Sequence, residues 1–422
     1  MAGIIEKYGG YIGKLAPKHP VAARKMLLTG FKLFGFKLDH MPDKRLPESR
    51  KFLASLLNDI VVDMLKHPEK AALTSILTPC ELLYAADINP LCAELYSSFV
   101  NGAHAERYFA ELAEEKGISE TFCSYHKVLL GGAYAGVFPK PAFIVNTSLI
   151  CDANNLTFRD LSKHFGIDQF YIDVPDGTGD GCIDYVADQL RELKVFIEDH
   201  THKKITDDKI RTLVGRSGKT IENLLKAQPL RAEKYLAGDM ASELYEIYIT
   251  HIGLGTEKTL KYTELLLEDL KKAEKAHGTR ILWVHTIPNW QKPLRDMFNY
   301  NENATIISCD MNYDSLLVMD PEKPYESMAK RLVNSTFNGD GEIRIQASVD
   351  MAKRLNADGA IVFCHWGCKQ TMGLSGRLKD ELTKAGIPTL VLDGDGCDER
   401  NSSDGQVATR LNAFMEMLGY KG

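Results

Sequence analysis

Four of the nine cysteines lie where predicted β-strands end. Cys151 follows AFIVNTSLI, Cys309 follows TIIS, and Cys364 and Cys368 close AIVFCHWGC. Open parallel sheets bind ligands at the carboxyl ends of their strands. Soft thiolates are the preferred ligands of iron–sulfur clusters and also bind zinc. The sequence therefore indicates a thiolate metal site, with a buried core thiol as the alternative for any one of these cysteines.

The spacing of these cysteines does not select the metal. The chain contains no C-x-x-C pair, so the compact ferredoxin spacings are absent, and three residues separate Cys364 from Cys368. A zinc site formed by Cys364, His365 and Cys368 is one alternative. No fourth zinc ligand is evident from the sequence, however.

Two glycine-containing segments resemble phosphate-binding loops only in part. Residues 176–181, DGTGDG, follow a predicted strand, but their alternating glycines do not match G-x-G-x-x-G. We favour a flexible strand-to-helix turn there. Residues 215–220, GRSGKT, lack the leading glycine of a Walker A loop because position 213 is leucine, and no strand precedes them. We therefore reject a Walker A loop.

Glu94 is the carboxylate whose surroundings best suit catalysis. It lies in DINPLCAELY, an apolar setting soon after the first predicted βα unit. Apolar burial raises the pKa of a carboxyl group and suits it to proton transfer. An ordinary surface glutamate is the alternative. His126 and His365 also draw attention because each lies near a cysteine of interest.

The elements that must position these residues alternate between strands and helices. Short β-branched and aromatic runs occur in PAFIVNTSLICDANN and QFYIDVPDGTGDG, and a helical stretch follows each. The strand signal returns at ILWVHTIP, TIISCDMN, GAIVFCHWGC and TLVLDGDG, again alternating with helices. This alternation predicts parallel βαβ units and an α/β fold.

The pattern divides the chain into four parts, since 422 residues are too many for one compact core. We predict a helical N-terminal extension over 1–66, a first α/β domain over 67–185, a helical connector over 186–275 and a second α/β domain over 276–422. The basic amphipathic segment 25–37 is expected to pack on its own protein, with a membrane surface as the alternative.

Composition argues against two classes of function. The chain has 51 Lys and Arg against 57 Asp and Glu, a net charge of -6, which disfavours general nucleic-acid binding. No apolar run approaches the roughly 18–20 residues that span a bilayer, and the N-terminus lacks a signal-peptide pattern. We therefore expect a cytoplasmic protein without a membrane span, in a compartment that keeps thiols reduced.

An ordered set of motifs resembles a known family. The motifs are TPCELLYAADIN, FCSYHK, NTSLICDANN, CHWGCKQTMG, and TLVLDGDG followed by QVATRLNAFMEML. From about residue 70 onward they resemble the subunits of 2-hydroxyacyl-CoA dehydratases, including the 2-hydroxyglutaryl-CoA dehydratase D-component, and of related benzoyl-CoA reductases. The resemblance implies two flavodoxin-like (Rossmann-like) parallel-sheet domains together with helical segments.

The resemblance also implies a set of ligands. Carried over by motif, Cys123, Cys151 and Cys368 bind a [4Fe–4S] cluster, and the fourth iron is left open to water or substrate. Cys151 and Cys368 are also strand-end cysteines, so the two lines of inference agree there. Glu94 matches the carboxylate after the family's D-x-N segment and is assigned as an acid or base at the hydroxyl or cluster site.

The reaction implied is the reversible loss of water from a 2-hydroxyacyl-CoA to give an enoyl-CoA. The β-proton is not acidic, so a single electron first turns the thioester into a ketyl radical, which expels the hydroxyl. A separate ATP-dependent iron–sulfur activator supplies that electron. The expected partners are therefore this activator, a CoA-thioester substrate, and a homologous second dehydratase subunit or a second copy of the chain.

Two other functions remain open at this stage. One is an ATP-dependent iron–sulfur reductase of the benzoyl-CoA reductase or double-cubane type, and the other is a non-catalytic subunit that relays electrons. The chain carries Cys80 where relatives usually have another residue. We predict that Cys80, Cys309, Cys364 and Cys397 are buried thiols, with additional iron as the alternative.

Overall fold

The computed structural model describes residues 2–420 and contains two separate four-stranded sheets, both entirely parallel. The first has the order β2-β1-β3-β4 and the second the order β6-β5-β7-β8. The strands of the first sheet are β1 (Ala71–Thr74), β2 (Asn89–Cys92), β3 (Phe143–Thr147) and β4 (Gln169–Ile172). Those of the second sheet are β5 (Thr279–Val284), β6 (Ala304–Cys309), β7 (Gly359–His365) and β8 (Thr389–Gly394). Both orders match the start of the flavodoxin order 2-1-3-4-5. The predicted α/β fold with two flavodoxin-like sheets is confirmed.

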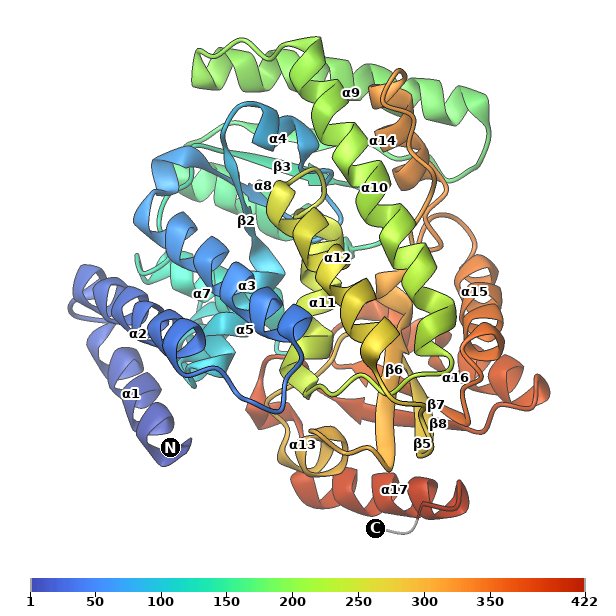
Figure 1. Ribbon diagram of the computed structural model, residues 1–422. Helices are drawn as coiled ribbons and strands as arrows, with labels where there is room; N and C mark the ends of the chain where they lie inside the picture. The colour runs from blue at the N-terminus through green and yellow to red at the C-terminus, as the bar shows by residue number, and fades with distance from the viewer. Residues whose placement is uncertain (1, 421–422) are drawn as a thin grey trace.

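Helices cover both sheets and fill the space between them (Figure 1). Before and around the first sheet lie α1 (Ala2–Leu15), α2 (Pro20–His40), α3 (Glu48–Lys66), η1 (Pro68–Lys70), α4 (Glu81–Ala85), α5 (Ala93–Gly102), α6 (Glu106–Glu115), α7 (Ser124–Tyr134) and α8 (Asp152–Phe165). In the middle of the chain lie α9 (Asp180–Thr201), α10 (Asp207–Arg231), α11 (Met240–Ile252) and α12 (Glu257–Lys272). Around the second sheet lie α13 (Lys292–Phe298), η2 (Asp310–Asn312), α14 (Pro324–Val333), α15 (Gly341–Arg354), α16 (Lys369–Lys384), η3 (Glu399–Asn401) and α17 (Asp404–Met417).

The N-terminal helices confirm the predicted helical character of this region. In α2 the buried residues Ala23, Leu27, Phe31 and Gly35 recur every fourth position, which places them on one face of the helix. The Phe31 ring meets the Phe99 ring of α5 edge-on at 5.5 Å. The segment 25–37 therefore packs on its own protein. Within residues 2–420, no helix has both the length and the apolar character needed to cross a bilayer.

The structure of the middle of the chain shows that neither glycine-containing segment forms a phosphate-binding loop. Residues 176–181 connect β4 to α9, and Gly179, the residue before α9, has a φ of +125°. This is the strand-to-helix turn that we favoured. Residues 215–220 lie inside α10, which is incompatible with a phosphate-binding loop. Because α9 begins at Asp180, the proposed domain boundary at 185/186 falls within a helix, and the division into domains stays a proposal.

The sequence patterns did not reveal strand β2. It has only four residues, NPLC, and includes Pro90, which lacks a backbone N–H. Such a strand is tolerated at the edge of a sheet, and β2 is the edge strand of the first sheet. This strand matters for function because it carries the chain directly to Glu94 in the first turn of α5.

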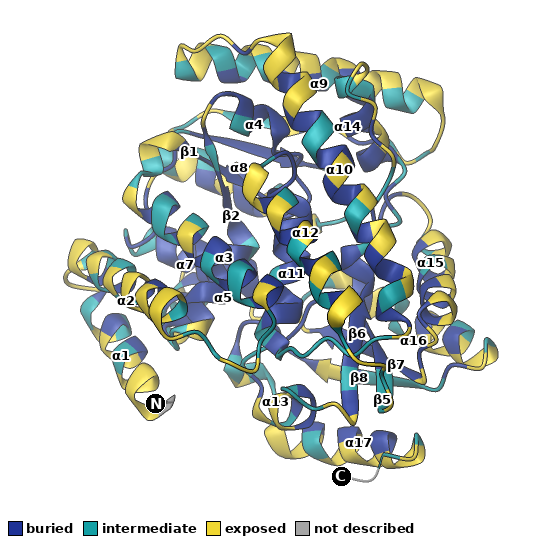
Figure 2. Ribbon diagram, in the orientation of Figure 1, coloured by how far each residue is buried: buried dark blue, intermediate teal, exposed yellow. Residues whose placement is uncertain are grey.

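One continuous hydrophobic core links both sheets to the middle helices, and a second cluster packs α15 and α16 against the second sheet. Figure 2 shows most of the strands buried, whereas α9 and α17 present exposed outer faces. The edge strands β4 and β8 are only partly buried. A buried ion cluster ties α3 to α10 and α11, since Arg50 contacts Glu243 and Glu246 and Arg231 contacts Glu246. Buried charge thus holds these three helices together.

Candidate functional site

Loops at the carboxyl ends of both sheets line one cavity of about 120 Å³. The first sheet contributes Ile76 after β1, Glu94 after β2 and Cys151 after β3, and the second contributes His285 after β5, Met311 after β6 and Cys368 after β7. Parallel sheets bind their ligands at these strand ends. The structure thus brings Cys123, Cys151, Cys368 and Glu94, the predicted cluster ligands and the predicted acid or base, around a single space.

Each of the three cysteines stands immediately before a helix. Cys123 is the N-cap residue of α7, Cys151 of α8 and Cys368 of α16, and none of the three side chains makes a capping hydrogen bond. By contrast, α10, α11 and α12 begin with Thr and Asp side chains that do cap the helix. The three sulfurs therefore do not serve as helix caps. Helix N-termini carry partial positive charge, which favours anionic ligands beside them.

The electrostatics of Cys123 and Cys151 fit a bound cationic centre. Burial raises the pKa of the Cys123 thiol well above its ordinary value, and the sulfurs of Cys151 and Cys368 raise it further. Burial is also the main cause of the raised pKa of Cys151. The Cys123 and Cys151 thiols therefore need a positive partner to act as thiolates, and iron supplies that charge. The donor set thus suits an iron–sulfur cluster.

A single metal ion does not fit the same residues. Across residues 2–420, no three His, Cys, Asp or Glu side chains are close enough to hold one ion. The zinc alternative fails because Cys364 and His365 are consecutive residues of β7, so their side chains point to opposite faces. In a [4Fe–4S] cluster each thiolate binds a different iron, so the ligands lie farther apart than those of a single ion.

Gly367 allows the second half of the chain to approach Cys123. Its φ is +84°, a conformation that favours glycine. A Cβ atom at this position would lie 2.7 Å from the backbone nitrogen of Cys123 and 2.7 Å from the carbonyl carbon of Phe122. Glycine is therefore required twice, once for the backbone conformation and once for the close approach that sets Cys368 beside Cys123.

His365 directs one ring nitrogen at the sulfur of Cys123. Its Nδ1 accepts the backbone N–H of Gly396 at 3.0 Å, and its Nε2 lies 3.4 Å from Cys123 Sγ. Burial lowers the pKa of this histidine, so the ring is neutral and carries one proton. Because Nδ1 is an acceptor, the proton resides on Nε2 and points to the sulfur. Hydrogen bonds of this kind tune metal-bound sulfurs.

Glu94 extends into the cavity from the first turn of α5. Its Oε2 accepts the backbone N–H of Ile76 at 3.0 Å and the thiol of Cys92 at 3.3 Å. Its Oε1 lies 3.8 Å from His126 Nε2, which is itself 3.8 Å from Cys151 Sγ. Burial raises the pKa of Glu94. The structure thus places a carboxyl group that resists ionisation next to one of the three cysteines.

Arg344 lines the cavity but was not predicted from the sequence. Its Nε and Nη2 donate to Asp310 Oδ2 at 3.0 and 2.8 Å, and its Nη1 donates to Thr371 Oγ1 at 3.1 Å. Arg344 lies within α15 in no recognisable motif, so nothing in the sequence marked it. Asp310 gave a weak signal, because it follows a predicted strand, as the candidate cysteines do.

The cysteines predicted to be buried thiols behave as expected. Cys80, Cys309, Cys364 and Cys397 are all buried. Cys309 stands at a strand end, yet its thiol donates to the carbonyl of His285 at 3.1 Å. Position at the end of a strand is therefore insufficient to place a sulfur in the cavity.

Backbone strain marks two residues of the cavity wall. Ile150, directly before Cys151, has a φ of +55°, and His285 has a φ of +83°. A β-branched residue in this region is an outlier that costs free energy, and such residues gather at functional sites. The local conformation thus marks these strand ends as more than connecting loops.

A family model described as "2-hydroxyglutaryl-CoA dehydratase, D-component" matches residues 75–418. The chain belongs to this family. The match includes Glu94 and all three cysteines of the cavity, and it extends over the helical middle of the chain. The resemblance inferred from the motifs is therefore confirmed.

Individual members of the dehydratase family are similar to the chain at low identity. It is 23% identical over 363 residues to the (R)-phenyllactyl-CoA dehydratase alpha subunit of Clostridium sporogenes, covering 81% of this chain and 87% of that one. It is 21% identical over 396 residues to the (R)-2-hydroxyisocaproyl-CoA dehydratase alpha subunit of Clostridioides difficile, covering 88% and 96%. The match to the (R)-2-hydroxyglutaryl-CoA dehydratase alpha subunit of Acidaminococcus fermentans, 23% identical over 300 residues, covers 66% of this chain and 61% of that relative.

Proposed function

We propose that this chain is the cluster-bearing subunit of a radical 2-hydroxyacyl-CoA dehydratase, a hydro-lyase, with Cys123, Cys151 and Cys368 holding a [4Fe–4S] cluster. The observation that carries the proposal is the convergence of three uncapped cysteines, each at a helix N-terminus, on one cavity. The names of the relatives support the choice of reaction, because each is a subunit of a 2-hydroxyacyl-CoA dehydratase.

The bound cluster would supply a single electron and an iron position without a cysteine ligand. The protein's own groups serve the remaining needs of the elimination. Helix N-termini at α7, α8 and α16 stabilise negative charge at the thiolates. Glu94, whose pKa is raised by burial, holds a proton at its carboxyl group beside the cavity and can transfer it to the leaving hydroxyl. The largely apolar walls limit the contact of the site with water.

The proposed reaction requires partners. Within the part of the chain that the structure describes, residues 176–181 form a turn and residues 215–220 lie in a helix, so neither candidate segment binds ATP as a phosphate loop. We propose that a separate ATP-dependent iron–sulfur activator delivers the electron. A homologous second subunit or a second copy of this chain completes the enzyme, and its substrate is a CoA thioester.

The test of the cluster is anaerobic purification followed by iron and acid-labile sulfide analysis. We expect about four irons per chain, as one [4Fe–4S] cluster requires. Cys123→Ala should abolish iron binding, whereas Cys397→Ala, which alters a buried thiol outside the cavity lining, should retain it. About eight irons would instead favour a double-cubane reductase. A chain without iron under anaerobic conditions would overturn the proposal.

Glu94→Gln tests the proposed acid. We expect kcat for dehydration to fall by about 10²- to 10⁴-fold, the usual contribution of a general acid or base, with the iron content unchanged. The assay couples the loaded complex to its activator and follows enoyl-CoA formation. Glu257→Gln, at an exposed ion pair with Arg216, is the matched control and should leave kcat unchanged. If Glu94→Gln also left kcat unchanged, the electron-relay alternative would replace the catalytic role.

A further inference from the structure

The cavity also indicates which acyl chains the protein accepts. We propose that this site takes a 2-hydroxyacyl-CoA with an apolar acyl chain, branched aliphatic or aromatic, and rejects a chain that ends in a second carboxylate. This inference rests on the proposed function. The inference depends on the nature of the walls and on the state of the charged groups among them.

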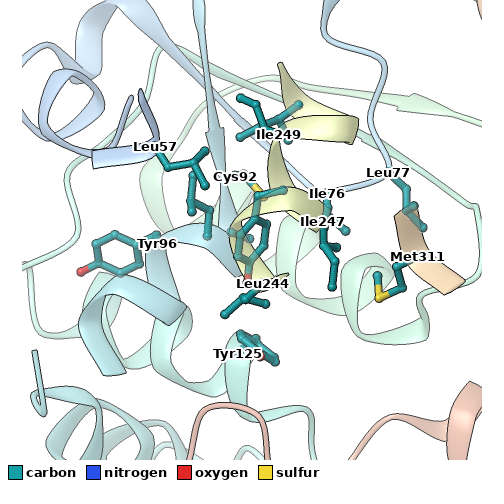
Figure 3. Close-up of a cluster of buried hydrophobic side chains, with 14 of the residues drawn as sticks. Leu57, Ile76, Leu77, Cys92, Tyr96, Tyr125, Leu244, Ile247, Ile249 and Met311 are labelled. Carbon is teal, nitrogen blue, oxygen red and sulfur yellow. The ribbon is translucent and has the colours of Figure 1, made fainter. Parts of the chain in front are cut away.

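Apolar side chains form the walls away from the cysteines. They come from the loop after β1, from α11, from η2 and from the segment before α15, and they are Ile76, Leu77, Leu244, Ile247, Met311 and Phe337. Figure 3 shows Ile76, Leu77, Leu244, Ile247 and Met311 within one buried hydrophobic cluster. All six side chains are apolar. Contact between such a surface and an apolar ligand removes apolar area from water and so favours binding.

The buried cation in this cavity is already neutralised. Arg344 is 2% exposed, and all three of its guanidinium nitrogens donate hydrogen bonds to Asp310 or Thr371. Its guanidinium also lies 4.6 Å from the centre of the Phe337 ring. A carboxylate on the substrate would have to compete with Asp310 for this charge. Arg344 therefore offers no free cationic site to a second carboxylate.

The remaining charged groups around the cavity do not favour a dicarboxylate either. Lys369 is exposed, as are Asp152 and Gln370, so these three residues mark the open side of the cavity. Glu94 is a carboxyl group inside it and offers no positive charge to a second carboxylate. Burial and the charge of Arg344 lower the pKa of His285, which keeps that ring neutral.

The physical cost of the wrong substrate is therefore large. A carboxylate placed among the six apolar side chains loses its water shell, and the cation buried beside them, Arg344, is already paired with Asp310. A buried charge without a partner is strongly unfavourable. An apolar chain of equal shape loses only unfavourable contacts with water. We expect the two chains to differ by at least about 100-fold in affinity, the scale on which unpaired polar groups discriminate between ligands.

Two thioesters of matched shape test the inference. 5-Methylhexanoyl-CoA and glutaryl-CoA differ in that two terminal methyl groups of the first are replaced by two carboxylate oxygens in the second. Neither has a 2-hydroxyl group to lose, so equilibrium binding to the anaerobically prepared chain can be measured by calorimetry without turnover. We expect 5-methylhexanoyl-CoA to bind at least about 100-fold more tightly. Equal or tighter binding of glutaryl-CoA would overturn the inference.

The corresponding 2-hydroxyacyl-CoAs separate this inference from the proposed function. Preferred binding of the apolar analogue without dehydration of either substrate by the activated complex would overturn the function and support the chain preference. Dehydration of 2-hydroxyglutaryl-CoA in preference to the apolar substrate would support the function and overturn the chain preference.

Two isoleucines of α11 provide a matched pair of variants. Ile247 lines the cavity, whereas Ile249, two positions later and also buried, lies outside its lining. We expect Ile247→Ala to reduce the affinity ratio between the two thioesters by about 10-fold and Ile249→Ala to leave it unchanged. The ratio is insensitive to the fraction of protein that is folded, so partial unfolding cannot mimic the result. An equal effect of both variants would contradict the proposed wall.

Discussion

The two α/β halves share a strand order, and corresponding strands even end in cysteine, yet only some of these cysteines reach the cavity. The third strand of each sheet leads to an N-cap cysteine that lines it, Cys151 after β3 and Cys368 after β7. The second strand of each sheet ends in a fully buried cysteine, Cys92 in β2 and Cys309 in β6. The comparison teaches that the position of a cysteine in the topology, more than its presence at a strand end, decides its role.

The halves differ in what else they bring to the cavity. The first half adds Cys123 before α7 and Glu94 at the start of α5. The second half adds His365, Gly367 and Arg344, which is paired with Asp310. Hence one half supplies most of the thiols and the acid, and the other supplies the groups that position and surround them. The site requires both halves, although each half has a similar sheet.

The largest expected effect separates the equivalent cysteines. Cys151→Ala and Cys368→Ala should each abolish cluster binding, because each removes a thiolate that faces the cavity. Cys92→Ala and Cys309→Ala should keep about four irons per chain, since these thiols donate to Glu94 and to a carbonyl instead. Iron and sulfide analysis measures both outcomes. Loss of iron from the Cys309 variant would break the topological distinction.

The next effect concerns the close approach of the halves. Gly367→Ala should destabilise the fold by about 3 kcal/mol, because the new Cβ adds both backbone strain and overlap with the Phe122–Cys123 backbone. Iron content should fall with it. Gly373→Ala, in α16 with open space around its position, is the control and should not destabilise. Urea unfolding midpoints compare the two. Equal midpoints would show that the contact between the halves is not tight.

The pH dependence of stability tests the contact between the halves at Glu106. Burial raises the pKa of Glu106, in α6, to about 8 from 4.5, and Glu399 of the second half raises it as well. The folded state therefore holds a proton that the unfolded state releases, so stability is full below about pH 4.5 and is lost as pH rises through about 8.

The matching variant is Glu106→Gln, which should remove this pH dependence. We compare the free energy of unfolding of the variant with that of the wild type at pH 4.5 and at pH 8, by denaturant unfolding. The difference, variant minus wild type, should be about 2 kcal/mol larger at pH 8 than at pH 4.5. Glu111→Gln, at a more exposed position of the same helix, should change neither value. A wild-type stability that rises over this range, with no difference in the variant, would contradict the assignment.

The smallest effect tests the histidine that the second half directs at Cys123. His365→Leu removes one N–H donor from the sulfur and should lower the reduction potential of the proposed cluster by about 20–60 mV, equivalent to one hydrogen bond. His365→Gln, which can still donate, should restore part of the shift. Anaerobic potentiometry with the iron content held equal provides the measurement. An unchanged potential would limit His365 to a packing role.

The sequence predicted the sheets better than it predicted the site. Alternating strands and helices gave the α/β fold, because local periodicity reflects burial directly. Cys151 and Cys368 could be proposed from strand ends, but Cys309 has the same local pattern and faces elsewhere. Cys123 follows no strand, so only the ordered motifs of the family pointed to it. Arg344 was missed because its partner Asp310 and its place at the cavity arise from long-range packing.

The contact between distant segments gives the proposed cluster a mechanical consequence. Cys123 and His365 are 242 residues apart in the chain and lie side by side in the fold. A cluster bound by Cys123, Cys151 and Cys368 would therefore act as a cross-link that closes a long loop and restricts the opening of one half from the other. Oxidative loss of the iron would remove that restraint together with the electron carrier. Damage by oxygen would then begin as a loosening of the whole molecule at the seam between its halves.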